Sequence, residues 1–85
     1  MTLRITFPTE GEPTTIRVEG HLTQRETPVL NAEYWLAGPR TQLDLSGLFS
    51  CDRAGIEMLR SLRAEGAELY GASPYIHQLL KGGRP

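Results

Sequence analysis

The 85-residue sequence contains a single cysteine, Cys51. One thiol excludes an internal disulfide and a cysteine-rich metal site, and it fits a protein of a reducing compartment. The two histidines, His21 and His77, do not have metal-ligand spacing with Cys51. We therefore expect neither a bound metal nor a cofactor.

The chain also lacks an excess of either charge and any long apolar run. Nine basic and ten acidic residues give a net charge of −1, so there is no electrostatic attraction to nucleic acid or anionic lipid. No apolar stretch approaches the ~20 residues that a membrane-spanning helix needs. Residues 1–8 have no apolar core of signal-peptide length. We expect a cytoplasmic protein with no nucleic-acid partner and no membrane insertion.

The length allows one domain, residues 1–85, with an ordered core over 1–80 and a tail over 81–85. A chain of this size buries a thin core, so it has room for one binding surface but little for a deep substrate pocket.

Hydrophobic periodicity and capping residues predict seven elements in the order ββαβαβα. The expected strands are residues 3–7, 16–20, 41–45 and 67–70. The expected helices are residues 28–37, with Thr27 as the cap, 54–65, and 74–80, with Ser73 as the cap. A Pro- and Gly-rich turn at 8–13 favours a hairpin of the first two strands. The rest requires parallel pairing with crossovers, which gives an α/β fold with a four-stranded, mostly parallel mixed sheet and helices on one face or on both.

The segment from Leu43 to Gly66 is the most informative part of the chain. A short strand leads into the turn Cys51-Asp52-Arg53-Ala54-Gly55, and the turn opens a helix that Asp52 is placed to cap. Such a turn points the first N–H groups of the helix outward, where a protein can bind an anion or present a modified side chain.

In the order and spacing of its pieces the chain resembles the STAS domain, the module shared by sulphate transporters and bacterial anti-sigma factor antagonists. Leu43–Leu48 resembles the central strand and its exit, and residues 51–55 resemble the family's turn. The long helix, its terminating Gly66 and the short helix Ser73–Leu80 follow in the family's order. The resemblance covers roughly residues 14–80.

The resemblance implies a non-catalytic regulatory module of transcription that binds an anti-sigma factor or serine kinase. In those antagonists a serine or threonine after the turn's aspartate is phosphorylated by the partner kinase. Here the position is Arg53 and the next is Ala54, and neither has a hydroxyl. We expect no phosphorylation switch at Arg53. Ser50 is the nearest hydroxyl, and its place at the strand exit disfavours it as a relocated phosphosite.

If the family's contact surface is retained, it comprises Asp52, Arg53, Ala54, Gly55, Ile56, Glu57 and Arg60. Ile56 is expected to lie off the apolar stripe that faces the sheet. Arg53 has two interpretations: it pairs with Asp52 or Glu57 in water, or it binds an acidic or phosphorylated group of a partner. Tyr34 and Trp35 form a candidate second interface, because aromatic residues are enriched at interfaces.

Two other functions stay open. A small cytoplasmic STAS subunit of an ABC-type lipid-transport complex would bind a transporter ATPase, and either reading is compatible with a homodimer. An enzyme is the third reading, in which Cys51 and His21 supply the minimum for nucleophilic catalysis if their strands are parallel neighbours. We expect no enzyme, because an isolated cysteine beside a leucine-rich strand is usually a small buried hydrophobe.

Overall fold

The computed structural model describes residues 3–7, 14–38 and 40–82. The strands are β1 (Leu3–Thr6), β2 (Thr15–Leu22), β3 (Gln42–Asp44), β4 (Leu48–Cys51) and β5 (Glu68–Tyr70). The helices are α1 (Thr27–Ala37), α2 (Arg53–Ala64) and α3 (Pro74–Gly82). The predicted α/β class and the three helices are confirmed. The four-stranded sheet is wrong by one strand, because the described residues form five and the order is ββαββαβα.

Strand β2 is the centre of the sheet. It pairs antiparallel with β1, which confirms the predicted hairpin, although the expected turn at 8–13 lies outside the described residues. On its other side β2 pairs in parallel with β3 through its first half and with β4 through its last residues. Strand β5 pairs in parallel with β3.

The unexpected strand β4 follows β3 after a tight turn. The N–H of Leu48 donates to the Leu45 carbonyl (3.0 Å), and the N–H of Gly20 donates to the Gly47 carbonyl (2.9 Å). The chain therefore steps sideways and then continues along β2, with a shift of register between Gly20 and His21. Because β4 is there to pair with it, β2 extends to Leu22 instead of ending at Gly20.

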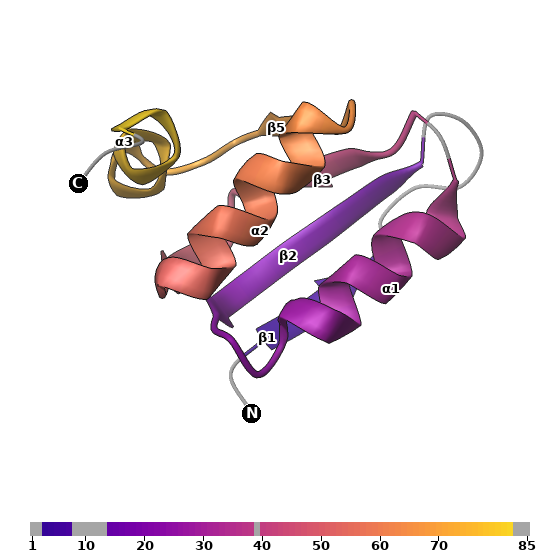
Figure 1. Ribbon diagram of the computed structural model, residues 1–85, viewed down its shortest axis with the longest axis horizontal. Helices are drawn as coiled ribbons and strands as arrows, with labels where there is room; N and C mark the ends of the chain where they lie inside the picture. Colours follow the sequence, from indigo (N-terminus) through magenta and orange to yellow (C-terminus); the bar gives the residue numbers. More distant parts are fainter. Residues whose placement is uncertain (1–2, 8–13, 39, 83–85) are drawn as a thin grey trace.

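Helices α1 and α2 cover the same face of the sheet, and α3 lies beside α2 (Figure 1). Alternating residues of β2 point into this layer: Ile16, Val18 and Leu22 are fully buried. Each such side chain contributes about 1.5–3 kcal/mol on burial. The core also contains Leu30 of α1, Leu59 of α2 and Ile76 of α3.

The helix ends follow the capping rules with two differences. Asp52 caps α2 and Ser73 caps α3, where the Ile76 N–H donates to the Ser73 hydroxyl (3.2 Å). Helix α1 contains Thr27 as its first residue, with Glu26 in the cap position. The expected tail is also partly wrong, because residues 81 and 82 belong to α3; residues 83–85 lie outside the described part of the chain.

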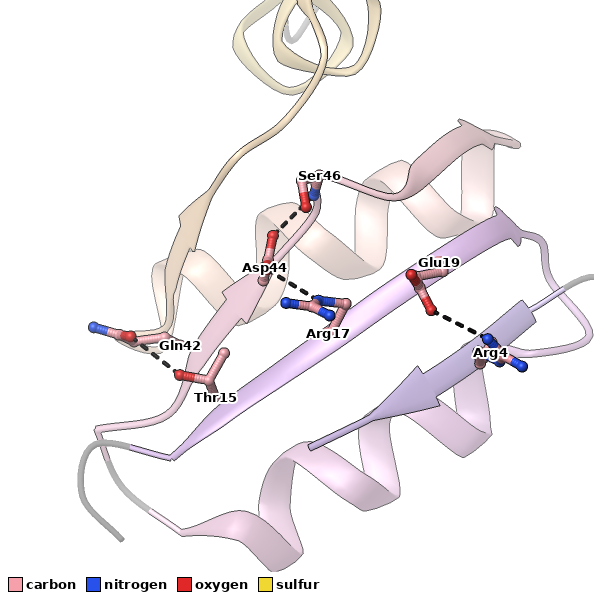
Figure 2. A network of polar contacts seen from close by, with 7 residues as sticks. All are labelled: Arg4, Thr15, Arg17, Glu19, Gln42, Asp44 and Ser46. Atoms are coloured by element: carbon pink, nitrogen blue, oxygen red, sulfur yellow. Dashed lines mark hydrogen bonds and ion pairs between the residues drawn. The ribbon is translucent and has the colours of Figure 1, made fainter. Parts of the chain in front are cut away.

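The opposite face of the sheet carries polar side chains (Figure 2). Its contacts are Arg4–Glu19 (4.0 Å), Arg17–Asp44 (3.3 Å), Thr15–Gln42 (3.4 Å) and the Ser46 N–H to Asp44 (3.0 Å). Burial alone would raise the pKa of Asp44, but the hydrogen bonds from Ser46 and Arg17 outweigh it and lower that pKa. Among the described residues no buried side-chain polar atom lacks a partner, so this face satisfies its own polar groups.

Candidate functional site

Asp52 joins three parts of the chain at the start of α2. One carboxylate oxygen accepts from the Gly55 N–H (2.9 Å) and the other accepts from the Gln24 N–H (2.9 Å). Its own N–H donates to the Leu22 carbonyl (3.1 Å). The N–H groups of Gly55 and then Gln24 hold the pKa of Asp52 below its usual range. The predicted cap is therefore confirmed, and the carboxylate also ties the β2–α1 loop to α2.

Gly55 lets α2 begin against the end of β2. A Cβ built at position 55 would lie 2.4 Å from the Leu22 carbonyl oxygen and 3.1 Å from Leu22 Cγ. Cβ atoms essentially never approach another heavy atom this closely. A residue without a Cβ is therefore required here, and the close approach of the two backbones fixes where the helix starts.

Arg53 is the first residue of α2 and projects into solvent, with 90% of its side chain exposed. Its Nε lies 3.3 Å from Oε2 of Glu57, one turn along the helix. Exposed pairs of this kind contribute about 0.3–0.5 kcal/mol. A partner's carboxylate or phosphate could therefore take over the guanidinium at little cost.

The structure divides the seven residues of the predicted contact surface. Asp52, Arg53 and Glu57 are exposed, and Ala54 and Arg60 are half-buried. Gly55 and Ile56 are buried. The expectation that Ile56 lies off the core stripe is wrong, because α3 packs against α2 and β4 and so widens the face that α2 buries. We call the accessible set, Asp52, Arg53, Glu57 and Arg60, the α2-start surface.

Phe49 is an exposed aromatic residue that the sequence analysis missed. It lies in β4, four residues before Arg53, and 70% of it is exposed. Its ring lies 6.0 Å from the His21 ring, centroid to centroid, at 54°. A strand at 48–51 predicts alternating exposure and so an exposed Phe49. The sequence pattern ends the preceding strand at residue 45 and predicts no strand at 48–51.

The geometry around Cys51 and His21 is unsuited to a catalytic pair. Their strands are parallel neighbours, as that reading required, but Leu22 is opposite Cys51 and His21 is opposite Ser50. Nδ1 of His21 lies 2.6 Å from the Ser50 hydroxyl. Burial, and then the Asp52 carboxylate, raise the pKa of the Cys51 thiol to about 12. A nucleophilic cysteine needs the opposite shift.

One of the two residues of the predicted second interface is buried and the other is exposed. Tyr34 is 5% exposed and packs in the core, since Leu30 and Tyr34 form the stripe of α1 that faces the sheet. Trp35 is 55% exposed, meets the Tyr34 ring edge-on at 5.0 Å, and donates from Nε1 to Asn31 Oδ1 (3.0 Å). Trp35 therefore remains accessible to a partner and Tyr34 does not.

Within the part of the chain that the structure describes, a hollow at the start of β3 and β5 is smaller than a typical ligand pocket. Its volume is about 250 Å³, below the roughly 300–1,000 Å³ of ligand pockets. Its lining residues are Arg40, Thr41, Gln42, Gly66 and Glu68. Over the described ranges no three His, Cys, Asp or Glu residues are placed to hold a metal ion. In the same part of the chain no helix has the length and apolar character to cross a bilayer.

Comparison with known proteins agrees with this arrangement of strands, turn and helices. The family model described as "Mlab, STAS domain" matches residues 5–81. The chain belongs to the STAS domain family. Among solved structures it resembles the STAS domain of an antisigma-factor antagonist from Rhodobacter sphaeroides, with a TM-score of 0.59 and 23% identity over 86% of this chain and 94% of that chain. At this identity the likeness is one of fold. A search of curated proteins gives no match.

Proposed function

We propose that this STAS domain is a non-catalytic regulatory module of the cytoplasm that binds a protein partner through the α2-start surface. Binding at position 53 is not switched by phosphorylation. The observation that carries the proposal is Arg53, an exposed arginine at the position where the antagonists of this family have their phosphorylated serine or threonine. An arginine there presents a permanent cation and bidentate donors.

The contacts at the turn support this reading. Asp52 and Gly55 perform the structural work of the turn, whereas Arg53 makes one exposed ion pair. A residue with little part in folding is free to contact a partner. By the family resemblance, the first partner to consider is an anti-sigma factor of the serine-kinase type.

A pull-down with quantitative mass spectrometry tests the proposal. The wild-type domain and Arg53→Glu serve as baits in extract of the source cells. Lys81→Glu is the matched control, since it makes the same charge change at an exposed position of α3. We expect a protein that wild type and Lys81→Glu retain equally and Arg53→Glu retains at least about 10-fold less. Equal retention by all three baits would contradict the proposed site, and no specific protein on wild type would contradict the proposed module.

The missing hydroxyl also favours a second candidate, a permanent subunit of an ABC-type lipid-transport complex. A subunit that stays bound needs no phosphorylation switch, and neither Arg53 nor Ala54 can be phosphorylated. The same experiment separates the two functions, because one predicts an anti-sigma kinase and the other a transporter ATPase among the retained proteins.

A further inference from the structure

Phe49 and Arg53 are exposed side chains near the carboxyl end of β4. They are four positions apart in the chain, so their Cα atoms lie at most about 14 Å apart. Phe49 is 70% exposed and the Arg53 side chain 90%. Figure 1 shows the end of β2 and the start of α2 meeting at this end of the molecule.

Phe49 has little part in holding the fold together. It is outside the buried core, and its ring makes a tilted contact with the ring of exposed His21. The side chains drawn in Figure 2, on the sheet face that lies away from α1 and α2, are polar and contact one another. A large aromatic side chain that is 70% exposed contributes little to folding from its position.

The residues next to Phe49 hold its backbone in a fixed position. His21 is held by its 2.6 Å contact with Ser50, and the pairing of His21 with Ser50 across β2 and β4 fixes both backbones. The next residue of β2, Leu22, accepts from the Asp52 N–H and contacts the start of α2. Phe49 and Arg53 are therefore attached to one rigid frame. Aromatic and arginine side chains are enriched at protein interfaces, and some of them dominate the binding energy.

We infer that Phe49 is the apolar anchor of the partner interface, and that the partner has an apolar socket for this ring bordered by a carboxylate or phosphate for Arg53. The charge of the border follows from Arg53, whose guanidinium is engaged by one weak, exposed pair with Glu57. This inference rests on the proposed function, since it describes the partner of the same surface.

Site-specific photo-crosslinking tests the anchor directly. The photoreactive analogue p-benzoylphenylalanine replaces Phe49 in the full chain, and irradiation is carried out in extract of the source cells. The matched control carries the same analogue at Tyr75, an exposed aromatic of α3. We expect a crosslinked protein from position 49 and not from position 75, joined at a segment with apolar residues and a nearby acidic or phosphorylated residue. Phe49→Ser should weaken binding of that protein about 10- to 100-fold while leaving the thermal midpoint within about 3 °C of wild type.

The outcomes distinguish this inference from the proposed function. A partner that depends on Arg53 but neither crosslinks at position 49 nor loses affinity in Phe49→Ser would overturn the anchor and leave the proposed function standing. A second copy of this chain crosslinked at position 49, or a basic segment in the socket, would overturn the stated partner chemistry. Absence of any Arg53-dependent partner would remove both.

Discussion

The contact between Gly55 and the end of β2 gives a sharp stability prediction for Gly55→Ala. On an ordinary helix this change stabilises by about 1 kcal/mol, because alanine has the higher helix propensity. Here the new methyl would meet the Leu22 carbonyl oxygen at 2.4 Å. Relief requires movement of backbone, since Leu22 is fully buried and its carbonyl accepts from the Asp52 N–H. Overpacking costs about 1–3 kcal/mol. Because only a backbone shift relieves this contact, we take the upper part of that range, about 2–3 kcal/mol, and subtract the roughly 1 kcal/mol gained in helix propensity.

We therefore expect Gly55→Ala to be less stable than wild type by about 1–2 kcal/mol, a fall in Tm of roughly 5–15 °C for a domain of this size. Urea and thermal unfolding followed by circular dichroism measure it. The pair Ser61→Gly and Ser61→Ala is the control, because Ser61 is exposed in the same helix and reports propensity without a clash. There the alanine variant should be the more stable. A Gly55→Ala protein as stable as wild type, or more so, would show that the α2–β2 approach is looser than the structure has it.

Three further predictions concern the same turn. Arg53→Glu should shift Tm by no more than about 3 °C, since an exposed pair is lost while an anion is gained in the first helical turn; a larger fall would mean that Arg53 supports the fold. Iodoacetamide should label Cys51 at least about 100-fold faster in denaturant than in the native state at pH 8, since folding raises the pKa of the thiol to about 12. Comparable rates would refute its burial. Folding lowers the pKa of Asp52, so its charged carboxylate stabilises the folded state at pH values above the unfolded pKa of about 3.9. The Tm of Asp52→Ala should therefore lie about 5 °C below that of wild type at pH 7, and this difference should shrink as the pH falls through the folded pKa. A difference that does not change with pH would refute the charged cap.

Much of the fold could be predicted because its signals are local. Alternation in β1 and β2, the Asp52 and Ser73 caps and the glycine at position 66 each depend on a few neighbouring residues. Strand β4 could not be predicted this way. It exists because the chain turns within three residues after β3 and rejoins β2 beyond a shift of register. That pairing joins residues about 30 positions apart, and hydrophobic periodicity does not report it.

The errors at the candidate site have the same origin. Helix α1 is apolar around most of its circumference, so the sequence does not say whether Tyr34 or Trp35 faces the sheet; tertiary packing buries Tyr34. The apolar stripe of α2 predicts a single sheet-facing side, which leaves Ile56 outside the core, whereas α3 covers a second side of the helix. Asp52 and Arg53 were placed well, since capping and exposure at a helix start follow from local chemistry.

In the turn before α2, the residues that hold the fold together differ from the residue whose side chain is exposed to solvent. Asp52 holds the β2–α1 loop and the helix start through both carboxylate oxygens, and Gly55 permits the close approach to Leu22. Position 53 lies between them, and its side chain contributes one exposed ion pair. Substitution at that position can therefore change what the surface offers a partner without changing the fold. A hydroxyl at this position can be phosphorylated, whereas the guanidinium of this chain keeps one charge at every physiological pH, so phosphorylation cannot act at residue 53 of the proposed surface.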